Sequence, residues 1–239
     1  MIWFVKFYVY VCSALIKPKN VSDEEEFQLK YIPSGMLSTS ELSLMQAKKE
    51  IAVFGERTQR MFGMVKDLFY EKNEDNFLKI YSRIEKYENI SDRMEIEIAN
   101  YLTFVAEGRL SSEGKEEIRI MLRTVTEIES IADSCNNLAR GIRRRNEGKS
   151  EFTDEQNHNI DQMFALLEKA LTRMNEILHM QEVVHDDINQ SYNIENEINN
   201  YRNQLKIHNM EDVNNKKYQY QDGVYYMDLV GESEKLGDY

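Results

Sequence analysis

The sequence predicts an all-α protein that consists of two tandem three-helix bundles. Three observations predict this fold: apolar residues recur at spacings of three and four over long stretches, both prolines (Pro18 and Pro33) lie near the start, and an acidic pattern occurs twice. That pattern is Glu-x-Glu-x-x-x-Asp, in residues 127–133 and again in residues 232–238. Its recurrence about a hundred residues apart, inside sequence with helical periodicity, indicates an internal duplication.

Residues 1–16 differ from the rest of the chain because they are apolar at all but two positions. A membrane-spanning helix needs about 20 residues, so we interpret this stretch as a truncated transmembrane segment. A signal peptide is the alternative, but no charged region precedes the stretch and no A-x-A site closes it. Lys17 and Lys19 would then mark the cytoplasmic side, and residues 17–37 are expected to form a linker.

The first three-helix unit is predicted over residues 38–146. Ser38 and Glu41 can form a capping box, in which a hydroxyl and a carboxylate each accept a hydrogen bond from a backbone N–H at the start of a helix. Apolar residues then follow at spacings of three and four, separated by short polar breaks. The three predicted helices cover residues 38–72, 76–107 and 112–145. Long helices joined by short connections pack antiparallel, which predicts a bundle.

The second three-helix unit is predicted over residues 151–239. Thr153 and Gln156 have the spacing of another capping box. The predicted helices cover residues 153–184, 192–208 and 214–239. The periodic pattern continues up to Tyr239 without a cap, so we expect this unit to be incomplete at its C-terminus.

The charge of the chain limits its partners. It has 42 acidic and 30 basic residues, for a formal net charge of −12. This balance argues against a nucleic-acid-binding surface, which needs a basic stripe to neutralise phosphates, and favours cations or basic partners. Cys12 and Cys135 form no CxxC motif, which is compatible with a reducing compartment. No phosphate-binding glycine loop or nucleophile motif is present, so we expect no enzymatic activity.

Acidic pairs four residues apart are the candidate metal ligands. Residues at this spacing share one face of a helix, where like charges are destabilising unless a cation offsets them. Two such helices facing each other would gather several carboxylate oxygens, which suit hard or borderline divalent cations. The alternative is that these charges only solvate the edges of the bundle. The four pairs are Glu88/Asp92, Glu129/Asp133, Glu195/Asn199 and Glu234/Asp238.

A basic cluster, Arg140 and Arg143 to Arg145, lies at the end of the third predicted helix. Favourable interaction with the helix C-terminal dipole explains it, and we prefer this to a site for phosphate or lipid headgroups.

The runs EIESIAD (residues 127–133) and ESEKLGD (residues 232–238) resemble the third helices of the two repeats in the PhoU family. Members of that family have six helices in two three-helix repeats and can bind multinuclear iron or zinc clusters through their acidic motifs. The resemblance implies that Glu88, Asp92, Glu129 and Asp133 are ligands in one unit. It implies the same for Glu195, Glu234 and Asp238 in the other unit, where Asn199 departs from the family pattern.

From Lys30 to its end, the chain is also similar to the C-terminal region of bacterial sodium-dependent phosphate (Na/Pi) cotransporters. An apolar segment followed by the stretch Tyr31–Ile51 and then a PhoU-like bundle carries this similarity. It implies a regulatory module on the cytoplasmic side of the inner membrane, held there by residues 1–16 and in contact with the transporter's membrane domain. The transport motifs of that family are absent, so the chain is not expected to transport phosphate itself.

Two other functions are compatible with the sequence. The chain could be a stand-alone PhoU-like regulator of phosphate signalling, in which residues 1–16 are a wrongly assigned start. It could also be a membrane-tethered helical scaffold that binds no ligand. Assembly into a homo-oligomer is compatible with each of these functions.

Overall fold

The computed structural model describes residues 27–32, 39–108, 110–180 and 184–239. Every regular element in this part of the chain is an α-helix, which confirms the predicted fold class. The six helices are α2 (Ser40–Tyr70), α3 (Glu74–Ala106), α4 (Ser112–Glu147), α5 (Asp154–His179), α6 (His185–Asn214) and α7 (Tyr220–Asp238).

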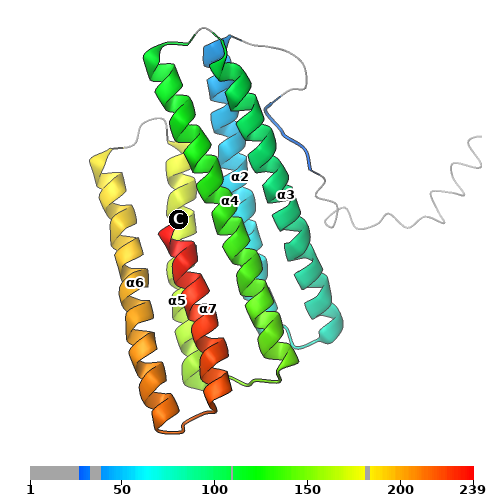
Figure 1. Cartoon of the computed structure of the whole chain (residues 1–239), viewed down its shortest axis with the longest axis vertical. Helices are drawn as coiled ribbons and strands as arrows, with labels where there is room; N and C mark the ends of the chain where they lie inside the picture. Colours follow the sequence, from blue (N-terminus) through cyan, green and yellow to red (C-terminus); the bar gives the residue numbers. More distant parts are fainter. Residues whose placement is uncertain (1–26, 33–38, 109, 181–183) are drawn as a thin grey trace, which may run out of the picture.

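The helices form two trios that lie side by side (Figure 1). Helices α2, α3 and α4 all pack against one another, and so do α5, α6 and α7. The two trios are joined by packing of α2 on α5 and of α4 on α7. Successive helices run antiparallel, as short connections dictate (Figure 1).

The buried faces of the first trio agree with the predicted apolar periodicity. On α4, for example, Ile118, Val125 and Ala132 are buried and lie seven residues, or about two helical turns, apart. Burial also raises the pKa of the Cys135 thiol, because the thiolate would lose its hydration there.

Helix ends agree less well with the prediction. The capping box of Thr153 and Gln156 is present at the start of α5, whereas Ser38 lies outside the described residues. The prediction that the fourth helix extends to Val184 is wrong: α5 ends at His179, and Val184 is 54% exposed just before α6. The last helix starts later than predicted, because α6 continues to Asn214 and Lys216 (φ 58°) turns the chain.

The two trios share a hydrophobic core. A single cluster of buried residues takes members from all six helices. At its centre the ring of Phe164 on α5 packs edge-to-face on Phe62 and Phe69 of α2, with both centroid distances at 5.6 Å. Arg145 belongs to this core and not to the surface basic cluster, since its guanidinium lies 4.6 Å from the Phe69 ring and 4.7 Å from the Phe152 ring. Burial lowers its pKa.

Residues 27–32 pack on the first trio. The Tyr31 N–H donates a 2.6 Å hydrogen bond to the fully buried Glu50 of α2, and the Arg93 guanidinium lies 4.0 Å from the Phe27 ring. The predicted membrane segment, residues 1–16, lies outside the described residues. None of the helices that the structure describes is long and apolar enough to cross a membrane.

Candidate metal centre

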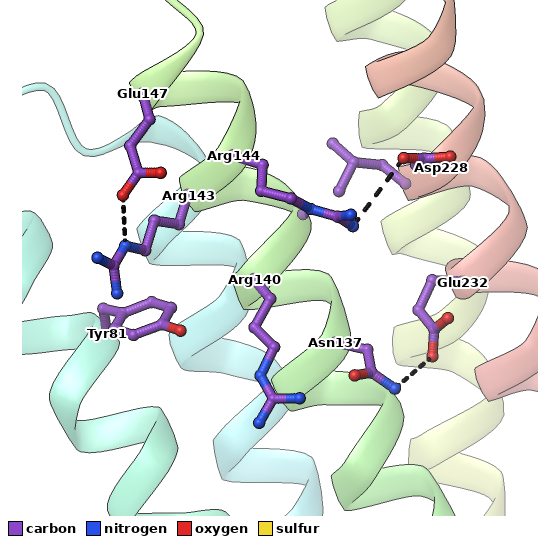
Figure 2. A pocket seen from close by; sticks show the side chains of 10 residues that line it. Tyr81, Asn137, Arg140, Arg143, Arg144, Glu147, Asp228 and Glu232 are labelled. Atoms are coloured by element: carbon purple, nitrogen blue, oxygen red, sulfur yellow. Dashed lines mark hydrogen bonds and ion pairs between the residues drawn. The ribbon is translucent and has the colours of Figure 1, made fainter.

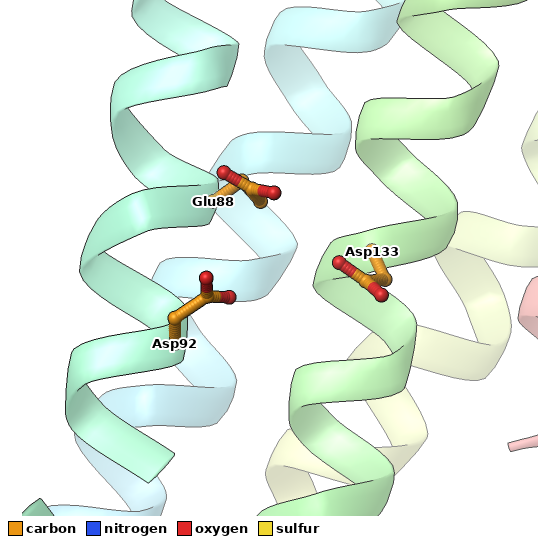
Figure 3. Close-up of side chains that lie close together, drawn as sticks. All are labelled: Glu88, Asp92 and Asp133. Atoms are coloured by element: carbon orange, nitrogen blue, oxygen red, sulfur yellow. The ribbon is translucent and has the colours of Figure 1, made fainter. Parts of the chain in front are cut away.

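Three of the predicted ligands meet between α3 and α4. Glu88 and Asp92 lie one turn apart on α3, and both carboxylates point toward Asp133 of α4 (Figure 3). Their orientation follows from the packing of α3, because Tyr87, Ser91 and Met94 are buried and leave these two side chains at the edge of the helix contact. The facing pairs that the sequence predicts therefore exist at this point of the bundle.

One oxygen from each of Glu88, Asp92 and Asp133 lies within 4.8 Å of the other two. Carboxylate oxygens bind zinc at about 2.0–2.2 Å, which places neighbouring oxygens of one ion roughly 3–3.5 Å apart. Small rotations of these side chains would close that difference. The group offers oxygen ligands only, so it suits Mg²⁺, Mn²⁺, Fe²⁺ or Zn²⁺ and lacks the thiolate set of a structural zinc site.

Burial, and then repulsion between neighbouring carboxylates, raises the pKa values of Glu88 and Asp92. Partial burial is the first cause of the raised pKa of Glu88, followed by the charges of Asp92 and Asp133. The pKa of Asp92 is raised by burial and then by Asp133 and Glu95. Since Glu88 and Asp92 resist ionisation here, a bound cation would relieve the repulsion and stabilise their ionised forms.

Glu129, the fourth predicted ligand of this unit, is near the group but is not one of the three that converge. Burial, and then the charges of Asp133, Glu95, Asp92 and Glu88, raise the pKa of Glu129 to about 7. We define Glu88, Asp92, Glu95, Glu129 and Asp133 as the acidic cluster.

The acidic pairs of the sequence do not predict Glu95 as a member of this cluster, nor Asn136 and Arg140 as its neighbours. Glu95 accepts a 3.0 Å hydrogen bond from the Thr126 hydroxyl of α4. Two effects lower the pKa of Glu88: the charge of Arg140 and a hydrogen bond from the buried Asn136 side chain. They are smaller than the burial and the neighbouring acidic charges that raise it. Spacing could have revealed Glu95, because it lies three residues after Asp92 on the same face of the helix.

The predicted ligands of the second unit are arranged differently. Glu234 forms an ion pair with Arg202 of α6, with 3.1 Å between Arg202 Nε and Glu234 Oε1. Burial and the charge of Glu234 raise the pKa of Asp238, while a hydrogen bond with Asn199 and the charge of Arg202 lower it. Glu195 lines an apolar pocket of about 370 Å³ that Asp238 and Tyr239 also line. The converging oxygens found among the described residues belong to the first unit alone.

The surface arginines of α4 line a cleft between α3, α4 and α7 of about 760 Å³ (Figure 2). Arg143 is 2.7 Å from Glu147 and stacks on the Tyr81 ring, and Arg144 is 3.9 Å from Asp228. Three arginines therefore face three carboxylates, since Glu232 also lines the cleft. The charges balance, as expected for solvated side chains near a helix C-terminus.

Replacing Glu129 with glutamine should stabilise the metal-free protein at neutral pH. The folded pKa of about 7 lies above the unfolded value of 4.5, so the folded state binds more protons between these values and its stability falls as pH rises through this window. Because Glu129 is partly solvated, we expect Glu129→Gln to increase the free energy of unfolding at pH 8 by about 1–2 kcal/mol. Below pH 4 the difference should vanish.

Urea titrations of the chelator-treated protein from pH 4 to 8 measure this effect. Glu85→Gln, at an exposed position of α3, is the matched control and should leave the pH dependence unchanged. Parallel stability curves for the wild type and Glu129→Gln would contradict the raised pKa.

Comparisons with known proteins agree with this architecture. Residues 51–142, which include the acidic cluster, match the family model of the PhoU domain. No curated protein matches the chain in sequence. Among solved structures, the phosphate transport system regulatory protein PhoU from Streptococcus pneumoniae is similar in fold, with a TM-score of 0.68 and 14% identity over 84% of this chain and 91% of that chain. Residues 51–142 thus match the PhoU domain, and the chain has a PhoU-like fold.

Proposed function

We propose that this chain is a PhoU-like regulator of phosphate transport that works by binding a divalent metal ion at the acidic cluster. The observation that carries the proposal is the convergence of Glu88, Asp92 and Asp133 within 4.8 Å, inside the segment that matches the PhoU domain. These three side chains would hold the ion, with Glu129 as a fourth ligand after a rotamer change. Bound iron or zinc would supply the positive charge that this group lacks.

The regulated partner that we propose is the membrane domain of a Na/Pi cotransporter. The net charge of −12 supports a basic partner surface, and cytoplasmic loops of membrane proteins are enriched in lysine and arginine. The apolar residues 1–16 support attachment at the inner membrane, with the bundle on its cytoplasmic side. A metal ion would neutralise part of the α3–α4 surface and so change its affinity for such loops.

Elemental analysis of the purified protein tests the metal-binding half of this proposal. We expect bound iron or zinc in the wild type and none in the double variant Asp92→Asn/Asp133→Asn. The matched control is Glu85→Gln/Glu97→Gln, which removes two exposed carboxylates of α3 outside the cluster and should retain the metal. Absence of metal from the wild type after reconstitution with either ion would refute this half.

Sodium-dependent uptake of radiolabelled phosphate tests the other half. Cells that lack the chain should show altered uptake, which the wild-type gene restores and Asp92→Asn/Asp133→Asn does not. Uptake that is the same with and without the chain would count against regulation of a cotransporter. Altered sodium-independent uptake would instead favour a stand-alone phosphate regulator.

A further inference from the structure

We propose that Arg202 is a built-in cation that replaces the metal ion in the second unit, so that the chain has a single metal centre. This inference rests on the proposed function, because it assigns metal binding to one of the two repeats. It follows from the duplication, the ion pairs of the second unit and the charge balance of the two repeats.

The duplication shows which residues correspond. An offset of 107 residues relates Glu88 to Glu195, Asp92 to Asn199 and Glu95 to Arg202, and an offset of 105 relates Glu129 to Glu234 and Asp133 to Asp238. Two positions have therefore changed character. An acidic ligand has become an amide at Asn199, and an acidic neighbour has become a cation at Arg202.

The structure places Arg202 where it neutralises the remaining acids. Its guanidinium donates from Nε and from a terminal nitrogen to Glu234 Oε1, the counterpart of Glu129. Both partners are partly buried, with side-chain exposures of 30% for Arg202 and 16% for Glu234. The charge of Arg202 also reaches Asp238, the counterpart of Asp133.

The ion pairs found among the described residues of the first unit do not include one to the acidic cluster. Arg140 acts on Glu88 and Lys235 on Asp133 through their charges, but neither makes an ion pair with the acidic cluster in the part of the chain that the structure describes. Five carboxylates gather there, whereas the second unit has three carboxylates and one guanidinium. A metal ion entering the second unit would have to displace Arg202 and leave it unpaired, at a cost that the first unit does not carry.

Asn199 adds to this difference. An amide oxygen can still bind a metal ion, but it carries no charge and binds more weakly than a carboxylate. Asn199 Oδ1 is buried and has no hydrogen-bond partner among the described residues, while the Asn199 side chain forms a hydrogen bond with Asp238. The amide N–H of Asn199 can thus donate a hydrogen bond to the Asp238 carboxylate, whereas an ionised carboxylate at position 199 has no hydrogen to donate.

The test is the number of Zn²⁺ ions bound per chain, measured by equilibrium dialysis and elemental analysis. We expect one ion for the wild type and none for Asp92→Asn/Asp133→Asn. The double variant Asn199→Asp/Arg202→Glu, which gives the second unit the acidic residues of the first, should bind two. Asn199→Asp alone is the matched control and should still bind one, because Arg202 remains.

Each result separates this inference from the proposed function. Two ions in the wild type would overturn the inference and leave metal binding intact, whereas no ion in the wild type would overturn the proposed function. One ion in a folded Asn199→Asp/Arg202→Glu protein would overturn the role of Arg202. If circular dichroism shows that this variant does not fold, the Asp92→Asn/Asp133→Asn variant decides the question. An ion that stays bound to it, and that a further Glu234→Gln substitution removes, would overturn the inference. Complete loss of bound ion from it would support the inference.

Discussion

Replacing Phe164 with alanine should lower the free energy of unfolding by about 3–5 kcal/mol, the usual cost of truncating a fully buried phenylalanine. Phe164 is 1% exposed, and its ring packs edge-to-face on Phe62 and Phe69 of the other trio. Three effects add up to this cost: the favourable transfer of the ring out of water is lost, a cavity is left behind, and the two aromatic contacts disappear. Urea unfolding followed by circular dichroism measures it.

The same experiment tests whether the two trios unfold together. Because they share one hydrophobic cluster, we expect a single transition in both the wild type and Phe164→Ala. Ile96→Ala is the matched control, since Ile96 is 56% exposed on α3 and its truncation should change stability by less than about 0.5 kcal/mol. Two separate transitions in the wild type would show that the trios do not share a core.

A saturating divalent cation should raise the melting temperature of the metal-free protein by about 5–10 °C. A ligand at a hundred times its dissociation constant stabilises the folded state by about 2.7 kcal/mol, and each kcal/mol shifts the melting temperature of a protein of this size by about 2–4 °C. The effect should shrink as pH falls from 7 to 5, because the raised pKa values of Glu88, Asp92 and Glu129 make protons compete with the ion. Differential scanning calorimetry with Zn²⁺ measures the shift.

In Asp92→Asn/Asp133→Asn the shift should disappear, because two of the three converging ligands lose their charge. Without metal this variant should melt at or above the wild-type temperature, since it no longer concentrates like charges between α3 and α4. An equal Zn²⁺-induced shift in both proteins would place the ion elsewhere.

The periodic apolar pattern predicted the helices well because it reflects the requirement to bury one face of each helix. Ile118, Val125 and Cys135 of α4 are buried, as the apolar periodicity of this segment requires. The boundary near Val184 was missed, because Ile177 and Val184 are a heptad apart and the periodicity alone does not reveal that the chain leaves the helix after His179. Local backbone geometry, such as the positive φ of Lys216, decided the boundary before α7.

The candidate site was predictable where it depends on spacing within one helix. Glu88 and Asp92 share a face for that reason, and the duplication indicated which helix they meet. Which of Glu129 and Asp133 points inward depends on how α3 packs on α4, which spacing does not determine. The ion pair of Arg202 with Glu234 joins two helices, so it became visible only when α6 and α7 were placed side by side.

The central claim is that Glu88, Asp92 and Asp133 bind a metal ion, and anomalous X-ray scattering from crystals soaked in Zn²⁺ tests it most directly. We predict one anomalous peak per chain, between α3 and α4 and in contact with these three carboxylates. A chain with no peak at this place, at a Zn²⁺ concentration that gives saturation in solution, would contradict the account.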